Sequence, residues 1–376
     1  MTPAALTGAV AEAVAAAPAD GGLGLPVPSD LALRPVAVGA GDYTCALPLQ
    51  LAGAAARPAQ EVAEVLAARL GATPGISRAA VGERGVLALT LVDTVALAAA
   101  VVAAGAAYGR SRALDGAHMT ASIAGDLATA PDVPTAARRV KDEALARIAE
   151  AAGAHVTWTG QPDPGEVLRD GAARVEESAA SEAASTALSS FVARGEEPAL
   201  RYVLTRAPES TATARRGPVA QPPRAPGELA ERHPGAPNEL EERCRRVRGE
   251  AAFEVRYACA HAHLTLRHAH DLGVDPDTTE PGRFTDAHER AVLAAVAELP
   301  DRVALAARRR DVTVLTRHLE TTAAAYHRLA DTGRVLPRGP EPVTDMHRSR
   351  VLLTAAVRTT LAAGLAMLGV AVPDRM

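Results

Sequence analysis

RVLLTAAVRTTLAAGLAMLGVAVPDRM, residues 350–376, has the apolar spacing of a buried helix. Its large apolar side chains return every three or four residues, which is the period of an α-helix with one apolar face. A stripe of this length has to be covered by other parts of the chain. We therefore expect a helix over 346–368 that packs inside a bundle. The stripe consists of Leu352, Leu353, Val357, Leu361, Leu365 and Leu368.

The rest of the region 238–376 has the same helical spacing. We expect helices over 286–307 and 312–329, and either one long helix or a broken pair over 239–272. Short loops separate these stretches, and helices joined by short loops favour a bundle. The prediction for 238–376 is therefore an all-α bundle of four or five helices.

The first 110 residues mix helical and strand-like patterns. Glu83-Arg84-Gly85 separates two short apolar runs and predicts a hairpin turn. Gly39-Ala40-Gly41-Asp42 predicts a turn that caps a helix starting near Tyr43. Residues 1–110 are thus expected to form a compact α+β unit. Its predicted helices cover 3–17, 58–70 and 93–107, and its predicted strands cover 33–38, 76–81 and 86–91.

The middle of the chain divides into two segments of different character. Lys141 to Ala152 predicts a helix that Gly153 ends, followed by a strand over 154–158. This is α/β texture over 111–205, too short for a full doubly wound sheet. Residues 206–237 contain seven prolines and few large apolar side chains, which predicts a linker or a long surface loop. The whole chain is thus predicted to be an α+β multidomain protein with segments 1–110, 111–205, 206–237 and 238–376.

Composition limits the classes of function. The 376 residues carry 40 basic and 44 acidic side chains, a net charge of −4, which excludes a strongly basic nucleic-acid binder but allows a local basic face. Lys141 is the only lysine, and the excess of arginine and alanine is typical of a GC-rich genome, as in a GC-rich bacterium. The three cysteines show no C-x-x-C spacing, which argues against a disulfide framework or a structural zinc site. We expect a cytoplasmic protein with no signal peptide and no membrane span.

Three stretches of this sequence resemble arginyl-tRNA synthetase, a class I aminoacyl-tRNA synthetase. The end of the chain reads Pro373-Asp374-Arg375-Met376 after a Leu-Gly-Val turn, where the family has Pro-Glu-Arg-Met. Residues 253–261, FEVRYACAH, are similar to the family's F-Y-V-Q-Y-A-H-A-R, which opens its anticodon-binding helical domain. Residues 199–204, ALRYVL, resemble the D-A-L-R-Y-F element that names this domain, with Pro198 at the aspartate position.

The third stretch lies near the N-terminus. Gly41-Asp42-Tyr43, LQLA at 49–52, EVA at 61–63 and GVL at 85–87 resemble, in this order, the additional N-terminal domain of these synthetases. In the family that domain holds the outer corner of the tRNA. Ala88 stands where the family has an asparagine that contacts the D-loop, so the resemblance implies that this contact is lost.

The resemblance also implies a set of candidate tRNA contacts in the C-terminal region. Glu254 replaces the family's anticodon-facing tyrosine, and a carboxylate neither stacks on a base nor attracts phosphate. Phe253 and Tyr257 can equally be core residues, and the arginines can be solvated or paired between helices. Four histidines over 261–270 are better explained by helix faces than by metal binding. The candidates for tRNA and anticodon binding are Arg256, Tyr257, Ala258, Arg317, Arg358, Arg375 and Met376.

The catalytic motifs of the family have no counterpart in this sequence. Residues 142–153, DEALARIAEAAG, match the helix that follows the family's His-x-Gly-His signature, and counting back places Asp132-Val133-Pro134-Thr135 on that signature. An aspartate would repel ATP phosphates, and a proline removes an N–H at the start of the helix. Lys141 lies in the wrong segment to supply the second, lysine-rich motif. We therefore expect a pseudoenzyme whose segment 111–205 is a truncated Rossmann-like remnant, with no catalytic residue, cofactor or metal.

Three functions remain open from the sequence. The first is a non-catalytic, tRNA-binding or regulatory accessory factor built from the N-terminal tRNA-corner-type domain and the anticodon-binding-type bundle. The second is an arginine–tRNA ligase with residual ATP-dependent activity. The third is a protein-interaction scaffold that no longer binds RNA. The expected partners are accordingly tRNA or another protein, and not DNA or a membrane.

Overall fold

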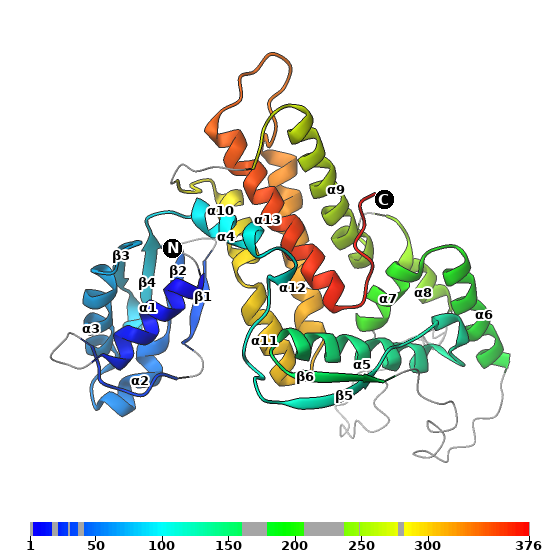
Figure 1. Ribbon diagram of the computed structural model, residues 1–376, viewed down its shortest axis with the longest axis horizontal. Helices are drawn as coiled ribbons and strands as arrows, with labels where there is room; N and C mark the ends of the chain where they lie inside the picture. Colours follow the sequence, from blue (N-terminus) through cyan, green and yellow to red (C-terminus); the bar gives the residue numbers. More distant parts are fainter. Residues whose placement is uncertain are drawn as a thin grey trace, which may run out of the picture.

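A computed structural model of the protein describes residues 3–16, 22–28, 31–36, 41–159, 179–206, 237–247, 249–276 and 282–375. The architecture is mixed and rich in helix (Figure 1). A small unit with a four-stranded sheet lies beside a larger helical body, and a short two-stranded sheet lies along one end of that body. The residues predicted to form the proline-rich linker lie, apart from its two ends, outside the described residues.

The small unit consists of an antiparallel sheet in the order β1-β2-β4-β3 with three helices. The hairpin predicted around Glu83–Gly85 is present and joins β3 to β4. α3 packs on β3, and both α1 and α2 pack on α3. The elements are α1 (Pro3–Ala15), β1 (Leu33–Pro35), β2 (Tyr43–Cys45), α2 (Leu47–Ala55), α3 (Ala59–Gly71), β3 (Ile76–Val81) and β4 (Leu87–Leu91).

The helix expected to start near Tyr43 is a wrong prediction, because Tyr43–Cys45 is strand β2 between β1 and β4. Tyr43 and Cys45 both point into the core, which is the alternation of a strand. The preceding turn is fixed by the carboxylate of Asp42, which accepts a 2.7 Å hydrogen bond from the Leu91 amide instead of capping a helix. Gly41 is required there, since it has a φ of 93° and a Cβ would lie 2.8 Å from the Leu89 carbonyl oxygen.

The middle of the chain forms one β-α-β unit. Strands β5 (His118–Ser122) and β6 (His155–Thr159) are parallel neighbours, and α5 (Val133–Ala151) makes the crossover between them. α5 begins well before the predicted start at Lys141, because Asp132 caps it. The interpretation of this segment as a Rossmann-like remnant stays a prediction.

The helical body is built around α13, which packs on α4, α9, α10 and α12. The stretch 239–272 is a broken pair of helices, as one of the two expectations had it. The described helices of the helical body, besides α5, are α4 (Val95–Ala104), α6 (Ala179–Ala193), α7 (Glu197–Arg206), α8 (Pro237–Cys244), α9 (Ala251–Asp271), α10 (Ala287–Ala297), α11 (Leu299–Arg309), α12 (Thr313–Thr332) and α13 (Asp345–Met367).

The single helix predicted over 286–307 is two helices, α10 and α11. Pro300 lies in the first turn of α11 and has no N–H to donate to the carbonyl of Val296 one turn earlier. That carbonyl instead accepts a 2.7 Å hydrogen bond from the hydroxyl of Tyr108, which follows α4. The break between the helices therefore also attaches the end of the first segment to the bundle.

The small unit and the helical body are joined by paired polar contacts. Arg283 donates to both carboxylate oxygens of Asp42, at 3.1 and 3.0 Å, and Arg290 donates to the Gly41 carbonyl at 2.7 Å. α4, which belongs to the predicted segment 1–110, packs on α13 and α10. The segment boundaries stay predictions, but the contacts show that this helix is part of the bundle's core.

α13 alone among the described helices has the length and apolar composition of a membrane span. Of its most apolar stretch, 72% is buried inside the protein, as in the core helix of a bundle.

Candidate functional site

An aromatic cluster connects α9 and α12 at the predicted anticodon-facing region. Phe253, Tyr257 and His261 follow one another at four-residue steps on α9. The Tyr257 ring stacks with Phe253, with centroids 5.3 Å apart, and with His327 of α12, 5.6 Å apart. His261 shares a 2.9 Å hydrogen bond with the hydroxyl of Tyr326. Tyr257 is therefore packed by protein rings in the way that a base would otherwise pack on it.

Glu254 is held in place beside this cluster. Its carboxylate accepts a hydrogen bond from the Gly249 amide at 2.9 Å and lies 3.1 Å from Nε2 of His327. Two partners thus fix the carboxylate at the start of α9. Glu254 is thus part of the local packing and places an acidic group on this face.

Arg256 is a half-buried cation without an acidic partner in the described part of the chain. Its Nε is buried and makes no hydrogen bond. Burial lowers the pKa of its guanidinium, and the neighbouring Arg246 lowers it further. A half-buried guanidinium without an acidic partner attracts any anion that can reach its terminal nitrogens.

Arg358 attaches the C-terminal tail to the bundle. Its guanidinium donates to Asp374 at 2.7 Å and to the sulfur of Cys259 at 3.3 Å. Burial raises the pKa of the Cys259 thiol to about 11, with Arg358 acting in the opposite direction, so the sulfur accepts this bond as a thiol. The predicted RNA contact Arg358 therefore positions the tail and is not a free cation.

The other candidates lie in different environments. Arg317 and Arg375 are exposed, and neither guanidinium has a carboxylate partner in the parts that the structure describes. Arg317 precedes His327 by about three turns, roughly 15 Å along α12, so the structure does not bring it into the aromatic cluster. Ala258 has 0% exposure, which denies its side chain any direct contact with RNA. Met376 lies outside the described residues.

Asp132–Thr135, the positions predicted to align with the family's His-x-Gly-His signature, form the capped N-terminus of α5. Asp132 is the N-cap of α5, and its carboxylate accepts a 2.7 Å hydrogen bond from the amide of Thr135. Val133 is buried, and Pro134 has no N–H. The Thr135 amide, which could otherwise donate to a phosphate at this terminus, thus donates to the carboxylate of Asp132.

A buried ion cluster lies further along α5 and was not found from the sequence. Glu143 is 3% exposed and binds Arg147 of its own helix at 2.7 Å and Arg201 of α7 at 3.1 Å. It also accepts a hydrogen bond from the Ala124 amide. Arg201 belongs to the ALRY element, so this element's arginine holds α7 against α5. The i, i+4 spacing of Glu143 and Arg147 was the only local signal for this cluster.

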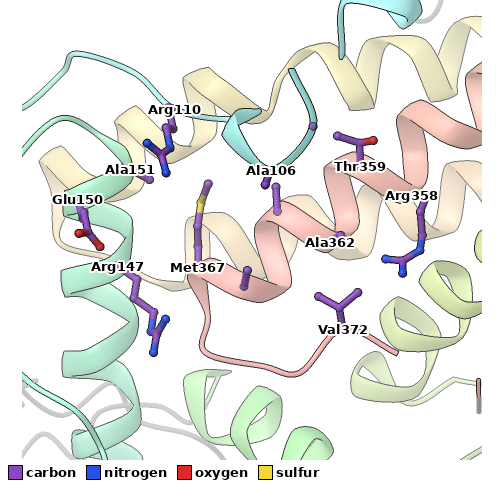
Figure 2. A pocket seen from close by; sticks show the side chains of 13 residues that line it. Ala106, Arg110, Arg147, Glu150, Ala151, Arg358, Thr359, Ala362, Met367 and Val372 are labelled. Carbon is purple, nitrogen blue, oxygen red and sulfur yellow. The ribbon is translucent and has the colours of Figure 1, made fainter. Parts of the chain in front are cut away.

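A cavity of about 600 Å³ lies between the end of α4, α5, α13 and the C-terminal tail (Figure 2). Arg110 and Glu150 lie at its α5 side, Arg358 lies at the other side, and Met367 and Ala362 lie between them. Sequence reasoning missed this cavity because its walls come from four separate parts of the chain. Within the described residues, no three histidine, cysteine or acidic side chains converge on a point that could hold a metal ion.

Comparison with known proteins places the C-terminal region in a family. Residues 255–376 match the family described as DALR anticodon binding domain. The arginine–tRNA ligase of Clavibacter sepedonicus is 41% identical over 132 residues, and that of Paenarthrobacter aurescens is 42% identical over 124 residues. The chain is related to the arginyl-tRNA synthetases.

The present chain spans about a quarter of the length of the curated ligases that it matches. The two alignments cover 35% and 33% of this chain, but only 24% and 23% of the ligases. The fold is similar to that of Thermus thermophilus arginyl-tRNA synthetase, with a TM-score of 0.54, 15% identity and 100% coverage of both chains. All seven candidate RNA contacts lie within the matched residues 255–376, whereas Asp132–Thr135 lie outside them.

Proposed function

We propose that this arginyl-tRNA synthetase relative is a non-catalytic accessory factor that binds tRNA through its C-terminal helical domain. The observation that carries the proposal is the helix start at Asp132. Where the aligned signature of the ligases would meet ATP, the chain has a carboxylate bonded to its own Thr135 amide and a proline beside it. An incoming phosphate would have to displace an anion that is already in place.

The sequence also has no second lysine to supply part of that machinery. Class I chemistry relies on positioned donors that stabilise the charge developing on ATP phosphate. Lys141 is the only lysine and lies two turns into α5, so no second lysine-rich loop exists.

Binding of tRNA is supported by the DALR anticodon-binding match and by the distribution of cations within it. Arg256, Arg317 and Arg375 have no carboxylate partner in the described part of the chain. Three unpaired guanidinium groups can release counterions from an RNA backbone. Because the net charge of the chain is −4, such binding depends on these local groups and weakens with salt.

The experiment for RNA binding is a filter-binding series with total tRNA between 50 and 200 mM salt. We expect the double variant R317Q/R375Q to bind roughly tenfold more weakly at the lower salt and to lower the salt slope by about two. The matched control is R138Q, an exposed arginine of α5 outside the C-terminal domain. Equal binding by all three proteins would contradict the proposed surface, and no binding by the wild type would remove tRNA as the partner.

Loss of catalysis is tested with ATP–pyrophosphate exchange in the presence of arginine. We expect exchange at background for the wild type and also for Asp132→Ala, because removal of the cap does not restore the missing donors. The variant should lose about 1 kcal/mol of unfolding free energy through its uncapped helix, measured by urea denaturation. Arginine-dependent exchange by the wild-type protein would instead support the residual-ligase alternative.

One observation favours the third function, a protein-interaction scaffold. The fixed carboxylate of Glu254 lies on the face where the ligase pattern has an aromatic ring, and it repels an RNA phosphate. Tighter tRNA binding by Glu254→Gln would indicate an RNA surface weakened by this charge, whereas no binding by either form would support the scaffold.

A further inference from the structure

The cavity between the end of α4, α5, α13 and the C-terminal tail has the dimensions of a small-molecule site. Its volume of about 600 Å³ is within the range of pockets that hold small ligands. Small side chains leave the space open, since Ala362 and Ala366 of α13 line the cavity together with Ala106, which lies just after α4. The cavity is separate from the aromatic cluster of α9 and α12 and from the start of α5.

The lining is aliphatic in the middle and charged at its ends. Met367 and Val372 complete the apolar wall, and none of the described residues that line the cavity is aromatic. A nucleotide base has no ring to stack on here, whereas an alkyl chain finds methyl and methylene groups. The apolar part of a ligand for this site is therefore aliphatic.

One of the charged groups at the ends is a cation that an anion can reach. Three guanidinium groups and one carboxylate, that of Glu150, line the cavity. Two of the cations are already paired, since Arg147 binds Glu143 and lies over the Trp158 ring, while Arg358 binds Asp374. Arg110 has no such partner in the described part of the chain and presents its donors beside Met367 (Figure 2).

We propose that this cavity binds a medium-chain aliphatic carboxylate, with the carboxylate at Arg110 and the alkyl chain along Ala362, Ala366 and Met367. The carboxylate of Glu150, which has no ion-pair partner among the residues that the structure describes, lies at the same end and weakens the site by repulsion. This gives a signature that nonspecific hydrophobic binding lacks: removal of the Arg110 charge weakens binding, and removal of the Glu150 charge strengthens it. The proposal is independent of whether the protein binds tRNA.

The test is isothermal titration of the full chain with butanoate, hexanoate and octanoate, and with 1-octanol as the neutral probe. We expect saturable binding that tightens roughly fourfold for each added CH₂ group. Octanoate should bind roughly tenfold more weakly to R110Q, several-fold more tightly to E150Q, and unchanged to R138Q, the matched arginine outside the cavity. The neutral alcohol should bind more weakly than octanoate.

Two variants that fill the cavity with a larger side chain test the site in a protein whose folding is checked separately. Ala366→Phe and Ala106→Leu both start from exposed positions that line the cavity, one on α13 and one just after α4, and either should abolish octanoate binding while thermal unfolding shows an intact protein. The proposal is overturned if the wild type shows no saturable binding of any carboxylate, or if the filled variants bind octanoate as the wild type does. Adenosine monophosphate is the remaining probe, and its binding in place of octanoate would overturn the aliphatic class.

Discussion

Glu143→Gln is expected to lower the free energy of unfolding by about 3–5 kcal/mol, because it removes the buried one of the two carboxylates that pair with Arg201. Arg201 is 12% exposed and Glu143 is 3% exposed, so water cannot replace the lost carboxylate. The amide also supplies only one oxygen, where the carboxylate uses both for Ala124, Arg147 and Arg201. The contact between α5 and α7 should loosen first, since Arg201 links these helices.

The matched control for this prediction is Glu197→Gln on α7. Glu197 also pairs with Arg201, at 2.9 Å, but its side chain is 38% exposed. A pair of this exposure contributes less than about 1 kcal/mol, so the control should unfold nearly as the wild type does. Urea denaturation at neutral pH measures both variants. Equal, small losses for the two would show that the buried cluster is no more important than a surface pair.

The same variant should change the dependence of stability on pH. Burial by itself raises the pKa of Glu143, but the Ala124 amide and the guanidinium groups of Arg147 and Arg201 outweigh burial and lower it from 4.5. A carboxylate with a lowered pKa stabilises the fold fully above its unfolded-state pKa and loses that contribution as the pH falls through its folded-state value. The stability difference between wild type and Glu143→Gln should therefore shrink below about pH 4.5.

Local periodicity was sufficient for the elements that carry their own signal. α3, the β3–β4 hairpin and α13 were predicted because their apolar spacing or their turn residues lie within a few residues of one another. β2 could not be predicted in this way. Tyr43–Cys45 is a strand because β1 and β4 flank it, and β4 comes from more than forty residues further along the chain.

The candidate site shows the same limit. Arg358 was identified through the resemblance as an RNA contact, but its role in holding the tail depends on Cys259 and Asp374, which only the folded chain brings together. Glu143 carries no local signal of burial apart from Arg147 at i+4. Its burial depends on Arg201, which lies 58 residues away. A sequence shows which groups are available and does not show which of them the packing pairs.

Gly364→Ala is expected to destabilise the protein by about 2 kcal/mol, although alanine is the better helix former by about 1 kcal/mol. Gly364 lies on α13 where that helix meets α12, and a Cβ there would overlap Leu319, whose side chain is fully buried. Because Leu319 is packed in the core, either its side chain leaves its present rotamer or the backbones of the two helices move apart, and both cost packing energy. The small residue at 364 is thus what lets the central helix approach its neighbour.

A double-mutant cycle separates this overlap from a general effect on the helix. Leu319→Ala alone should cost about 2–5 kcal/mol through the cavity it leaves. The double variant L319A/G364A should cost clearly less than the sum of the two, by about 1–2 kcal/mol, because the added methyl group enters that cavity. Gly53→Ala in α2 is the matched control, since nothing lies within 4 Å of a Cβ at that exposed position. It should stabilise the protein slightly, and additive effects at 319 and 364 would show that the two side chains do not compete for space.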